Sequence, residues 1–469
     1  GILIIHDQNL GSNLVGGHVR HIRNIPESSA RHLGSHMSTP LNVMLLSHGF
    51  PPRETAGTER HTEALASALR SRGHQVTVVA ATRSPGAPQY SRETSPGLIR
   101  IVNNVATRAL ADGESDPNID ASLAEIEADL RPDVVHAHHL QFLSSTAQMT
   151  APTVVTLHDE WAWCPSGGLG LKDGNHICNG PVPSDCSPCH ASWRPRPSQS
   201  ARLLTKGAGI LAPLIAPHKL HSLYKRIPAS LRPNPIDRGE SPETADAAAY
   251  RNDRVMAWFA SADVRIAPSV HLQKKAQAMG LPPVQVIRHG LSSDWFKDSP
   301  FNGPRKGLVS IGTIAYHKGT DRVVEAWRNA FATQNTPLTL HGPILDAEAS
   351  LGHPVGPILS PAQVHQTLSQ SRAMIMGSRW PENAPLIILE ARASGCPVIA
   401  PNLGGISELV VDGVDGFLFD SDDPKGIETA LLRLDASGPL NPRPPPRFDD
   451  AVDEIETIYH QLVRNRSCA

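Results

Sequence analysis

The sequence lacks a charge excess of either sign, and it lacks an apolar run of membrane-spanning length. Its 43 lysine and arginine residues oppose 45 aspartate and glutamate residues, which gives a formal net charge of −2. General nucleic-acid binders usually carry a basic excess, so this balance disfavours that class. No apolar run approaches the roughly 20 residues that a transmembrane helix needs. The hydrophobic share of 40% is typical of a globular protein.

The first 37 residues also lack the charged, apolar and small-residue regions of a secretory signal. Gly34-Ser35-His36-Met37 is typical of a cloning scar, and we expect residues 1–37 to be a vector-derived tag segment. Because no export signal is recognised, the expected location of the protein is the cytoplasm.

Apolar runs alternate with helical patterns along two stretches of the chain. Residues 41–49 have the pattern of a buried strand, and residues 58–73 that of a helix capped by Thr58 and ended by Gly73. The same cycle restarts after residues 302–304. Such alternation is typical of parallel βαβ units, and a length of 469 residues exceeds one ordinary core.

This alternation predicts an α/β fold of two Rossmann-like, doubly wound domains that face each other across a cleft. Ligands bind such folds beyond the carboxyl ends of the strands. The predicted parts are an N-terminal domain over residues 38–300, a C-terminal domain over 301–445, and a last helix over 446–469 that packs back on the N-terminal domain.

Two loops at predicted strand ends have the features of anion sites. Ala56-Gly57 precedes a helix, whose exposed backbone N–H groups and dipole favour an anion, although a plain helix cap is the alternative. Lys318-Gly319 enters the corresponding helix of the second domain. Lys318 could neutralise a phosphate as a point charge, or it could be a solvated lysine at a helix start.

Two glutamates flank an apolar helical segment near residue 386. Glu382 is expected in the loop before that helix, and Glu390 about a turn and a half inside it. A carboxylate among leucine and isoleucine side chains is costly unless it is hydrogen-bonded. Hydroxyl groups of a sugar and a ribose are suitable partners, and an ion pair of Glu390 with Arg392 is the structural alternative.

Taken in order, these motifs resemble those of the retaining GT-B glycosyltransferases of family 4. The resemblance extends approximately from residue 40 to residue 440, and the ordered series is more specific than any one of its parts. It rests on the glutamate pair and on the segments Gly73–Val79 (GHQVTVV), Asp133–His138 (DVVHAH), Thr156–Asp159 (TLHD), Ala267–Ser269 (APS), Gly312–Gly319 and Gly395–Leu418.

The resemblance implies a retaining transferase of the hexosyltransferase type, with the acceptor in the N-terminal domain and a UDP-, GDP- or ADP-linked sugar in the C-terminal domain. Glu390 would hold the ribose hydroxyls, Glu382 the sugar hydroxyls and Lys318 the diphosphate. Gly57 would let the backbone approach the diphosphate, and His158 matches the active-site histidine. No metal ion or other cofactor is implied for catalysis. The implied catalytic residues are His158, Glu382 and Lys318, and the implied donor-binding residues are Gly57, Gly312, Thr313, Lys318, Glu382, Asn383, Ala384, Pro385, Leu386 and Glu390.

The chain departs from the family pattern at the diphosphate. Thr313 stands where the family usually has an arginine after the glycine of the lysine-containing loop. We expect Arg379, Arg53 or His317 to substitute, or backbone N–H groups and Lys318 to act alone. Two milder departures are Ala56 in the first loop, and His289-Gly290 where the family more often has Asn-Gly.

A cysteine-rich insertion over residues 164–190 follows His158 and Asp159 directly. Disulfides are not expected in a cytoplasmic enzyme, and four thiols with a Cys-x-x-Cys pair suit a structural zinc site. His176 and His190 are possible substitute ligands, and free thiols or an iron–sulfur cluster are the alternatives. We expect this loop to shape the acceptor pocket. The expected zinc ligands are Cys164, Cys178, Cys186 and Cys189.

We expect the acceptor to be a small soluble molecule of secondary metabolism. A basic amphipathic patch could meet a membrane surface and hence a lipid acceptor, but a solvated helix face explains it better. A catalytically weakened binding or scaffold protein is a further alternative, which Thr313 supports, and a sugar-nucleotide epimerase fits the glutamate spacing less well. The residues of the basic patch are Lys219, His221, Lys225 and Arg226.

Overall fold

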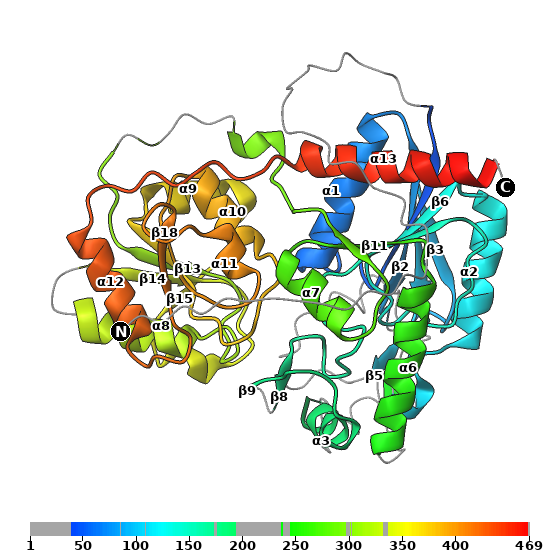
Figure 1. Ribbon diagram of the computed structural model, residues 1–469, viewed down its shortest axis with the longest axis horizontal. Helices are drawn as coiled ribbons and strands as arrows, with labels where there is room; N and C mark the ends of the chain where they lie inside the picture. The colour runs from blue at the N-terminus through cyan, green and yellow to red at the C-terminus, as the bar shows by residue number, and fades with distance from the viewer. Residues whose placement is uncertain are drawn as a thin grey trace, which may run out of the picture. The chain divides into compact units, whose positions relative to one another are not determined.

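The computed structural model describes the following parts of the chain: 39–84, 86–107, 109–172, 176–193, 236–237, 244–296, 301, 303–331 and 336–467. The expected tag segment and the basic patch at 219–226 lie outside the described residues. From Pro40 to Ala469 the chain forms one compact unit. Its elements, labelled in Figure 1, form two mainly parallel sheets.

The first sheet has eight strands in the order β12-β11-β7-β6-β1-β2-β4-β3, and only the pair β3 and β4 is antiparallel. Strand β1 is almost wholly buried because helices cover both faces of the sheet, as its continuous apolar sequence predicts. The strands are β1 (Asn42–Ser47), β2 (Gln75–Thr82), β3 (Arg92–Ser95), β4 (Leu98–Val102), β6 (Val134–Ala137), β7 (Thr153–Thr156), β11 (Val264–Ala267) and β12 (Val284–Val286).

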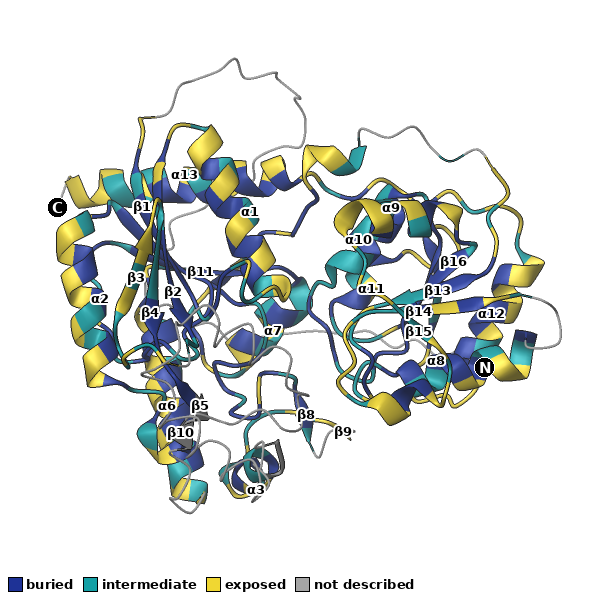
Figure 2. Cartoon of the chain, turned by 180° about the vertical axis from the view of Figure 1, so that it is seen from behind, coloured by how far each residue is buried: buried dark blue, intermediate teal, exposed yellow. Residues whose placement is uncertain are grey.

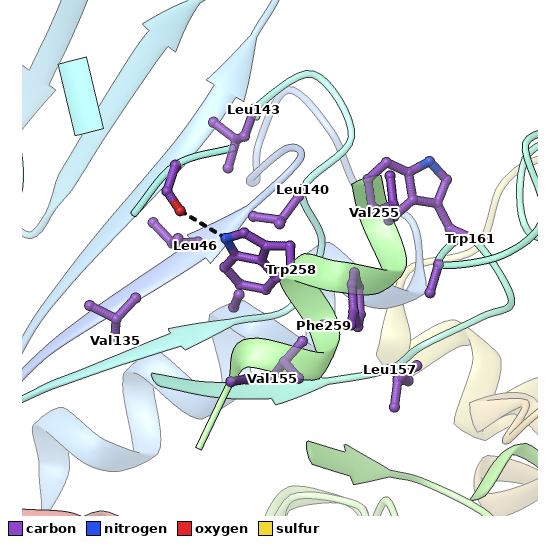
Figure 3. Close-up of a cluster of buried hydrophobic side chains, with 14 of the residues drawn as sticks. Leu46, Val135, Leu140, Leu143, Val155, Leu157, Trp161, Val255, Trp258 and Phe259 are labelled. Carbon is purple, nitrogen blue, oxygen red and sulfur yellow. Dashed lines mark hydrogen bonds between the residues drawn. The ribbon is translucent and has the colours of Figure 1, made fainter. Parts of the chain in front are cut away.

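Successive residues of β1 pack into two separate cores, one on each face of this sheet. Met44 and Leu46 contact the core that includes α2 and α6, whereas Val43 and Leu45 contact the core that includes α1 and α13. Figure 3 shows the first of these cores, where the Trp258 indole also donates a 2.9 Å hydrogen bond to a backbone carbonyl oxygen. The surrounding helices are α1 (Gly57–Ser71), α2 (Pro117–Leu130), α6 (Ala245–Ser261), α7 (Val270–Ala278) and α13 (Phe448–Ser467).

The second sheet has six parallel strands in the order β15-β14-β13-β16-β17-β18, again with a core on each face. Figure 2 shows its strands as largely buried and its helices with exposed outer sides. The elements are β13 (Leu308–Ile311), α8 (Thr320–Phe331), β14 (Leu338–His341), β15 (Val355–Gly356), α9 (Pro361–Gln370), β16 (Ala373–Ile375), α10 (Leu386–Ala393), β17 (Val398–Pro401), α11 (Ile406–Leu409), β18 (Gly416–Phe419) and α12 (Gly426–Ala436).

The remaining elements are short, and three of them belong to the cysteine-rich segment. These are helix α3 (Pro183–Trp193) and the hairpin of β8 (Leu171–Lys172) and β9 (His176–Ile177). In the described part of the chain, no helix combines the length and apolar character needed to cross a bilayer. The others are β5 (Val105–Thr107) paired with β10 (Ile236–Asp237), and the 3-10 turns η1 (Leu110–Asp112), η4 (Ser293–Phe296) and η5 (Ala347–Ser350).

Strand order places the carboxyl ends of particular strands where a ligand can bind. The chain leaves β1 toward β2 on one side, and β6 pairs with β1 on the other, so the strand order reverses at β1. In the second sheet the same reversal occurs at β13, which lies between β14 and β16. Ligands of doubly wound sheets bind at such reversals, so the loops after β1 and β13 are the expected positions.

One helix start differs from its prediction. Thr58 was expected to cap α1, but the N-cap residue is Ala56, which has no side chain to accept a hydrogen bond from the first turn. Thr58 lies inside the helix, where its backbone oxygen accepts from the Thr62 hydroxyl. The prediction of a Thr58 cap is therefore wrong, and the first turn of α1 keeps backbone N–H groups without a side-chain cap.

Candidate functional site

A cavity of about 470 Å³ is lined by residues from the carboxyl-end loops of both sheets. This volume lies in the range of ligand-binding pockets. The first sheet contributes the start of α1 and residues after β7, β11 and β12, and the second contributes the end of β13 and the loop into α10. Except for Glu390, every residue proposed from the sequence for catalysis or donor binding lines this cavity: His158, Glu382, Lys318, Gly57, Gly312, Thr313, Asn383, Ala384, Pro385 and Leu386.

The start of α1 presents backbone to this cavity. Ala56, Gly57 and Thr58 all line it, and no side chain caps the helix. A Cβ atom added at Gly57 would meet no atom within 4 Å, so the glycine leaves open space beside the first turn. Exposed N–H groups at the positive end of a helix of 15 residues favour an anionic ligand.

Glu382 and Lys318 face each other inside the cavity. The Lys318 Nζ atom lies 3.1 Å from Glu382 Oε1 and over the Trp380 ring, 4.8 Å from the ring centre. The carboxylate is buried, yet Oε1 lacks a partner with good hydrogen-bond geometry among the described residues. We interpret this short distance as an ion pair without a well-aligned hydrogen bond, so the ammonium group is able to turn toward a ligand.

Close backbone packing positions the loop that carries Glu382 and Asn383. The Gly405 N–H donates to the Glu382 carbonyl oxygen at 2.8 Å. A Cβ atom at Gly405 would stand 1.8 Å from the Asn383 carbonyl oxygen, and Gly404 has a φ of +62°. Only glycine fits this approach, which explains the Gly-Gly pair after β17.

Asn383 also links this loop to the first sheet. Its Nδ2 atom donates to the His158 carbonyl oxygen at 3.1 Å, while Oδ1 is buried without a hydrogen-bond partner among the described residues. A buried polar atom without a partner is costly, so Oδ1 is a candidate contact for a ligand hydroxyl or amide. The Asn383 side chain thus joins the two halves of the cavity.

Four histidines meet near the cavity: three follow strands β6, β7 and β12, and His61 belongs to α1. The His138 Nδ1 atom lies 3.1 Å from His158 Nε2, and the His61 ring lies tilted against the His289 ring with ring centres 4.3 Å apart. The ring nitrogens of His61, His138 and His158 all lie within 4.8 Å of one another. Sequence reasoning assigned a role only to His158. His138 and His289 could have been found from the sequence because each follows a predicted strand. No feature of the sequence pointed to His61.

Burial keeps these imidazoles neutral. It lowers the pKa of His158 well below its usual range, and the neighbouring His138 and His289 lower it further. The pKa of His61 is also lowered well below its usual range by burial and by His289 and His158. At neutral pH the His158 ring is therefore a neutral hydrogen-bond donor and acceptor in the cavity, not a cation.

Glu390 lies on α10, one turn beyond the cavity-lining Leu386. Burial raises the pKa of its carboxyl to about 7, and Arg60 opposes the rise. The expected alternative of an ion pair with Arg392 is wrong, because Arg392 donates instead to the carbonyl oxygens of Leu409, Arg443 and Pro444. Among the described residues, the Glu390 carboxylate has no hydrogen-bond or ion-pair partner.

This raised pKa makes the stability contribution of Glu390 depend on pH. The folded state holds a proton on Glu390 up to about pH 7, whereas the unfolded carboxyl releases it near its ordinary pKa of 4.5. Folding stability from this group is therefore lost as pH rises between these values. We expect Glu390→Gln to unfold at the same urea concentration as the wild type at pH 4.5. At pH 8 the variant should be more stable, by up to about 3 kcal/mol. A stability difference that does not change with pH would contradict this assignment.

The cations expected to replace the missing arginine are held elsewhere. Arg379 makes two hydrogen bonds to Asp321, and Arg53 pairs with Glu93 at 2.8 Å. Neither of them lines the cavity, and His317 does not line it either. Of the described residues that do, Lys318 is the sole lysine or arginine. Lys318 and backbone N–H groups are therefore the positive groups available in the cavity to replace the arginine that the family usually has at Thr313.

The predicted zinc ligands lie apart from this cavity. Cys164, Cys178, Cys186 and Cys189 all line a second, smaller cavity within the cysteine-rich segment. The fifth described cysteine, Cys396, is buried in the second sheet, and burial raises the pKa of its thiol to about 12.

Two family models match the two halves of the chain. The model described as Glycosyltransferase Family 4 matches residues 55–198, and the model described as Glycosyl transferases group 1 matches residues 292–441. The chain is a family 4 glycosyltransferase. The predicted family and enzyme class are therefore confirmed, and the cavity of this glycosyltransferase contains residues from both matched regions.

Curated relatives resemble this glycosyltransferase over most of its length or over a shorter part of it. Glycogen synthase of Mycobacterium tuberculosis is 23% identical over 433 residues, which cover 83% of this chain and 85% of the relative. A UDP-Gal:α-D-GlcNAc-diphosphoundecaprenol α-1,3-galactosyltransferase of Escherichia coli is 38% identical over 108 residues, which cover 21% of this chain and 28% of the relative.

Solved structures establish the GT-B fold of the glycosyltransferase, as predicted. Sucrose-phosphate synthase from Thermosynechococcus elongatus is 17% identical and superposes with a TM-score of 0.58, covering 90% of this chain and all of that one (100%). HepE from Anabaena in complex with UDP is 14% identical, with a TM-score of 0.53 and coverage of 92% and 100%. At these identities the likeness concerns the fold alone.

Proposed function

We propose that this glycosyltransferase moves a sugar from a nucleotide diphosphate sugar to an acceptor, with retention of the anomeric configuration. The observation that carries the proposal is the arrangement in one cavity of Lys318, the uncapped start of α1 and the buried Glu382 carboxylate. Positive groups suit a diphosphate and a carboxylate suits sugar hydroxyls. Solved structures with a related fold include HepE in complex with UDP and starch synthase IV of Arabidopsis thaliana bound to ADP and acarbose.

In this proposal the protein stabilises the charge that develops on the departing diphosphate. Lys318 turns from Glu382 to the diphosphate, and the α1 N–H groups beside Gly57 approach it from the opposite side. Preplaced donors in a cavity that excludes water reduce the energy of such a transition state. No metal ion is assigned to this step.

Retention is proposed to follow from attack on the same face that the diphosphate leaves. The departing phosphate accepts the proton of the acceptor hydroxyl, so no carboxylate attacks the anomeric carbon. Glu382 is therefore assigned to sugar hydroxyls and not to a nucleophilic role, which separates this enzyme from the two-carboxylate retaining glycosidases. His158, neutral because it is buried, is placed beside the transferring sugar.

The donor is tested by thermal shifts with UDP, GDP, ADP and their sugar-linked forms. A ligand that binds only the folded state stabilises it by about 2.7 kcal/mol at one hundred times its dissociation constant. We expect one nucleotide series to raise Tm selectively. Glu390→Ala should abolish that rise because it removes the proposed ribose contact, while Glu454→Ala on the exposed side of α13 should keep it. An unchanged shift in Glu390→Ala would remove Glu390 from the donor site.

Turnover separates this proposal from a binding or scaffold protein. Hydrolysis, in the absence of acceptor, of the sugar nucleotide that raises Tm would show that the site still breaks the glycosyl bond.

We propose a small molecule of secondary metabolism as acceptor, and the competing candidate is a lipid-linked acceptor. Transfer to soluble hydroxyl compounds and to lipid acceptors in micelles, measured with the same donor, distinguishes the two. NMR of the product anomeric proton tests retention.

A further inference from the structure

Four cysteines from three separate segments border one small cavity. Cys164 follows β7, Cys178 follows β9, and Cys186 and Cys189 belong to α3. The cavity has a volume of about 40 Å³, which is of the order of one or a few water molecules. Four thiols that border one space are the donor types of a structural zinc site, and glycosyl transfer as proposed uses none of them.

Local structure brings these cysteines together. Cys186 and Cys189 are three residues apart on a helix, so they share a face. The β8–β9 hairpin pairs Leu171 with Ile177, and the Cys178 N–H then donates to the Gly170 carbonyl oxygen at 2.7 Å. The Cys189 sulfur lies 3.8 Å from the Leu171 carbonyl oxygen, which brings the helix onto the hairpin.

Two buried cations lie beside the cluster, and each has a carboxylate partner: Arg251 lies 3.8 Å from Glu114 and Lys275 lies 2.6 Å from Glu160. Arg251 on α6 has no exposed surface, its Nε and Nη2 atoms have no hydrogen-bond partner among the described residues, and Cys164 and Cys186 are among the groups that interact with its charge. Lys275 donates to the Cys178 carbonyl oxygen at 3.2 Å and pairs with Glu160 at 2.6 Å. Four thiolates and one Zn²⁺ carry a net charge of −2, and Arg251 and Lys275 are the nearby positive groups, which the carboxylates of Glu114 and Glu160 already pair.

We propose that Cys164, Cys178, Cys186 and Cys189 bind one Zn²⁺ ion as four thiolates. Each thiol releases its proton when it becomes a ligand. In a tetrahedral site with Zn–S bonds of about 2.3 Å, the sulfurs stand about 3.8 Å apart. Within the described residues, no three of these sulfurs lie within 4.8 Å of one another. Binding therefore draws the helix, the hairpin and the turn at Cys164 together around the cavity.

The bound ion would stabilise the cysteine-rich segment next to the active site. The cysteine-rich segment begins directly after His158 and Asp159, which line the donor cavity. The hairpin residue Ile177 borders a groove that is also lined by Pro381, the residue before Glu382. Zinc would thus fix the segment that lies between the donor cavity and the groove. This role is structural and distinct from the chemistry of transfer.

The test begins with metal analysis of the full chain. After dialysis, elemental analysis should find about one zinc ion per chain. Exchange with Co²⁺ should produce the sulfur-to-cobalt charge-transfer absorption and the intense visible bands of a tetrahedral thiolate site. Because exchange uses the wild-type chain, this measurement stays decisive even where a cysteine variant fails to fold.

Variants then assign the ligands. Cys186→Ser with Cys189→Ser should reduce bound zinc to background, whereas Cys396→Ser, a buried cysteine of the second sheet, should keep it. Zinc that persists in the double variant and is lost in His138→Ala would place the ion at the histidine set and overturn the proposal. Iron with visible absorption in place of zinc, or a chain that binds no metal, would overturn it as well.

Discussion

Lys318→Met should lower kcat/KM for sugar transfer by about 10²–10³-fold, the cost of removing a preplaced donor from a developing charge. Lys318 is the sole lysine or arginine among the described residues that line the donor cavity, and Thr313 supplies no charge beside it. Methionine keeps an apolar stem that can still pack on the Trp380 ring. The loss therefore reports the ammonium group, and steady-state kinetics with the identified donor measures it.

The same variant removes the counter-charge of Glu382, so its effect on stability has to be separated from its effect on turnover. The buried Glu382 carboxylate loses its only ion-pair partner among the described residues, which destabilises the folded state. Adding Glu382→Gln should restore much of the lost stability, because the uncompensated charge disappears. It should not restore activity.

Lys425→Ala, at the exposed start of α12, is the matched control and should leave both stability and kcat/KM unchanged. Recovery of activity in the double variant would show that Lys318 acts only by neutralising Glu382. Lys318 would then be a structural residue and not a diphosphate ligand.

The fold could be predicted from the sequence because its strands are buried on both faces. A strand such as β1 appears as an uninterrupted apolar run, and the reversal of strand order at β1 and β13 then fixes which loops meet the ligand. The cavity-lining residues near Glu382 follow from an ordered series of motifs. Their positions at carboxyl strand ends were therefore predictable without contacts.

Contacts between distant segments were not predictable. The proposed pair of Glu390 with Arg392 is wrong for a simple geometric reason: residues two apart on a helix do not face each other. Arg392 instead finds carbonyl oxygens more than fifty residues later, near Pro444. The convergence of His61 with His138 is also tertiary, because it depends on how α1 lies over the ends of β6 and β7.

Gly405→Ala should lower kcat/KM by about 10²-fold or more, the cost of a misplacement of about 1 Å at an active site. The added Cβ would stand 1.8 Å from the Asn383 carbonyl oxygen, so the loop carrying Glu382 has to shift. That shift removes two contacts at once: the 2.8 Å hydrogen bond from Gly405 to Glu382, and the 3.1 Å link from Asn383 to His158.

The loss should appear in kcat as well as in KM, because the displaced loop serves both the donor sugar and the junction between the two sheets. Gly438→Ala is the matched control, since a Cβ there meets no atom within 4 Å and the residue has no positive φ. It should keep the wild-type Tm and activity. Circular dichroism checks that Gly405→Ala still folds. A folded Gly405→Ala enzyme with wild-type kinetics would mean that the position of Glu382 and Asn383 in this cavity is not the one used in transfer, because no rearrangement could accommodate the methyl group without moving them.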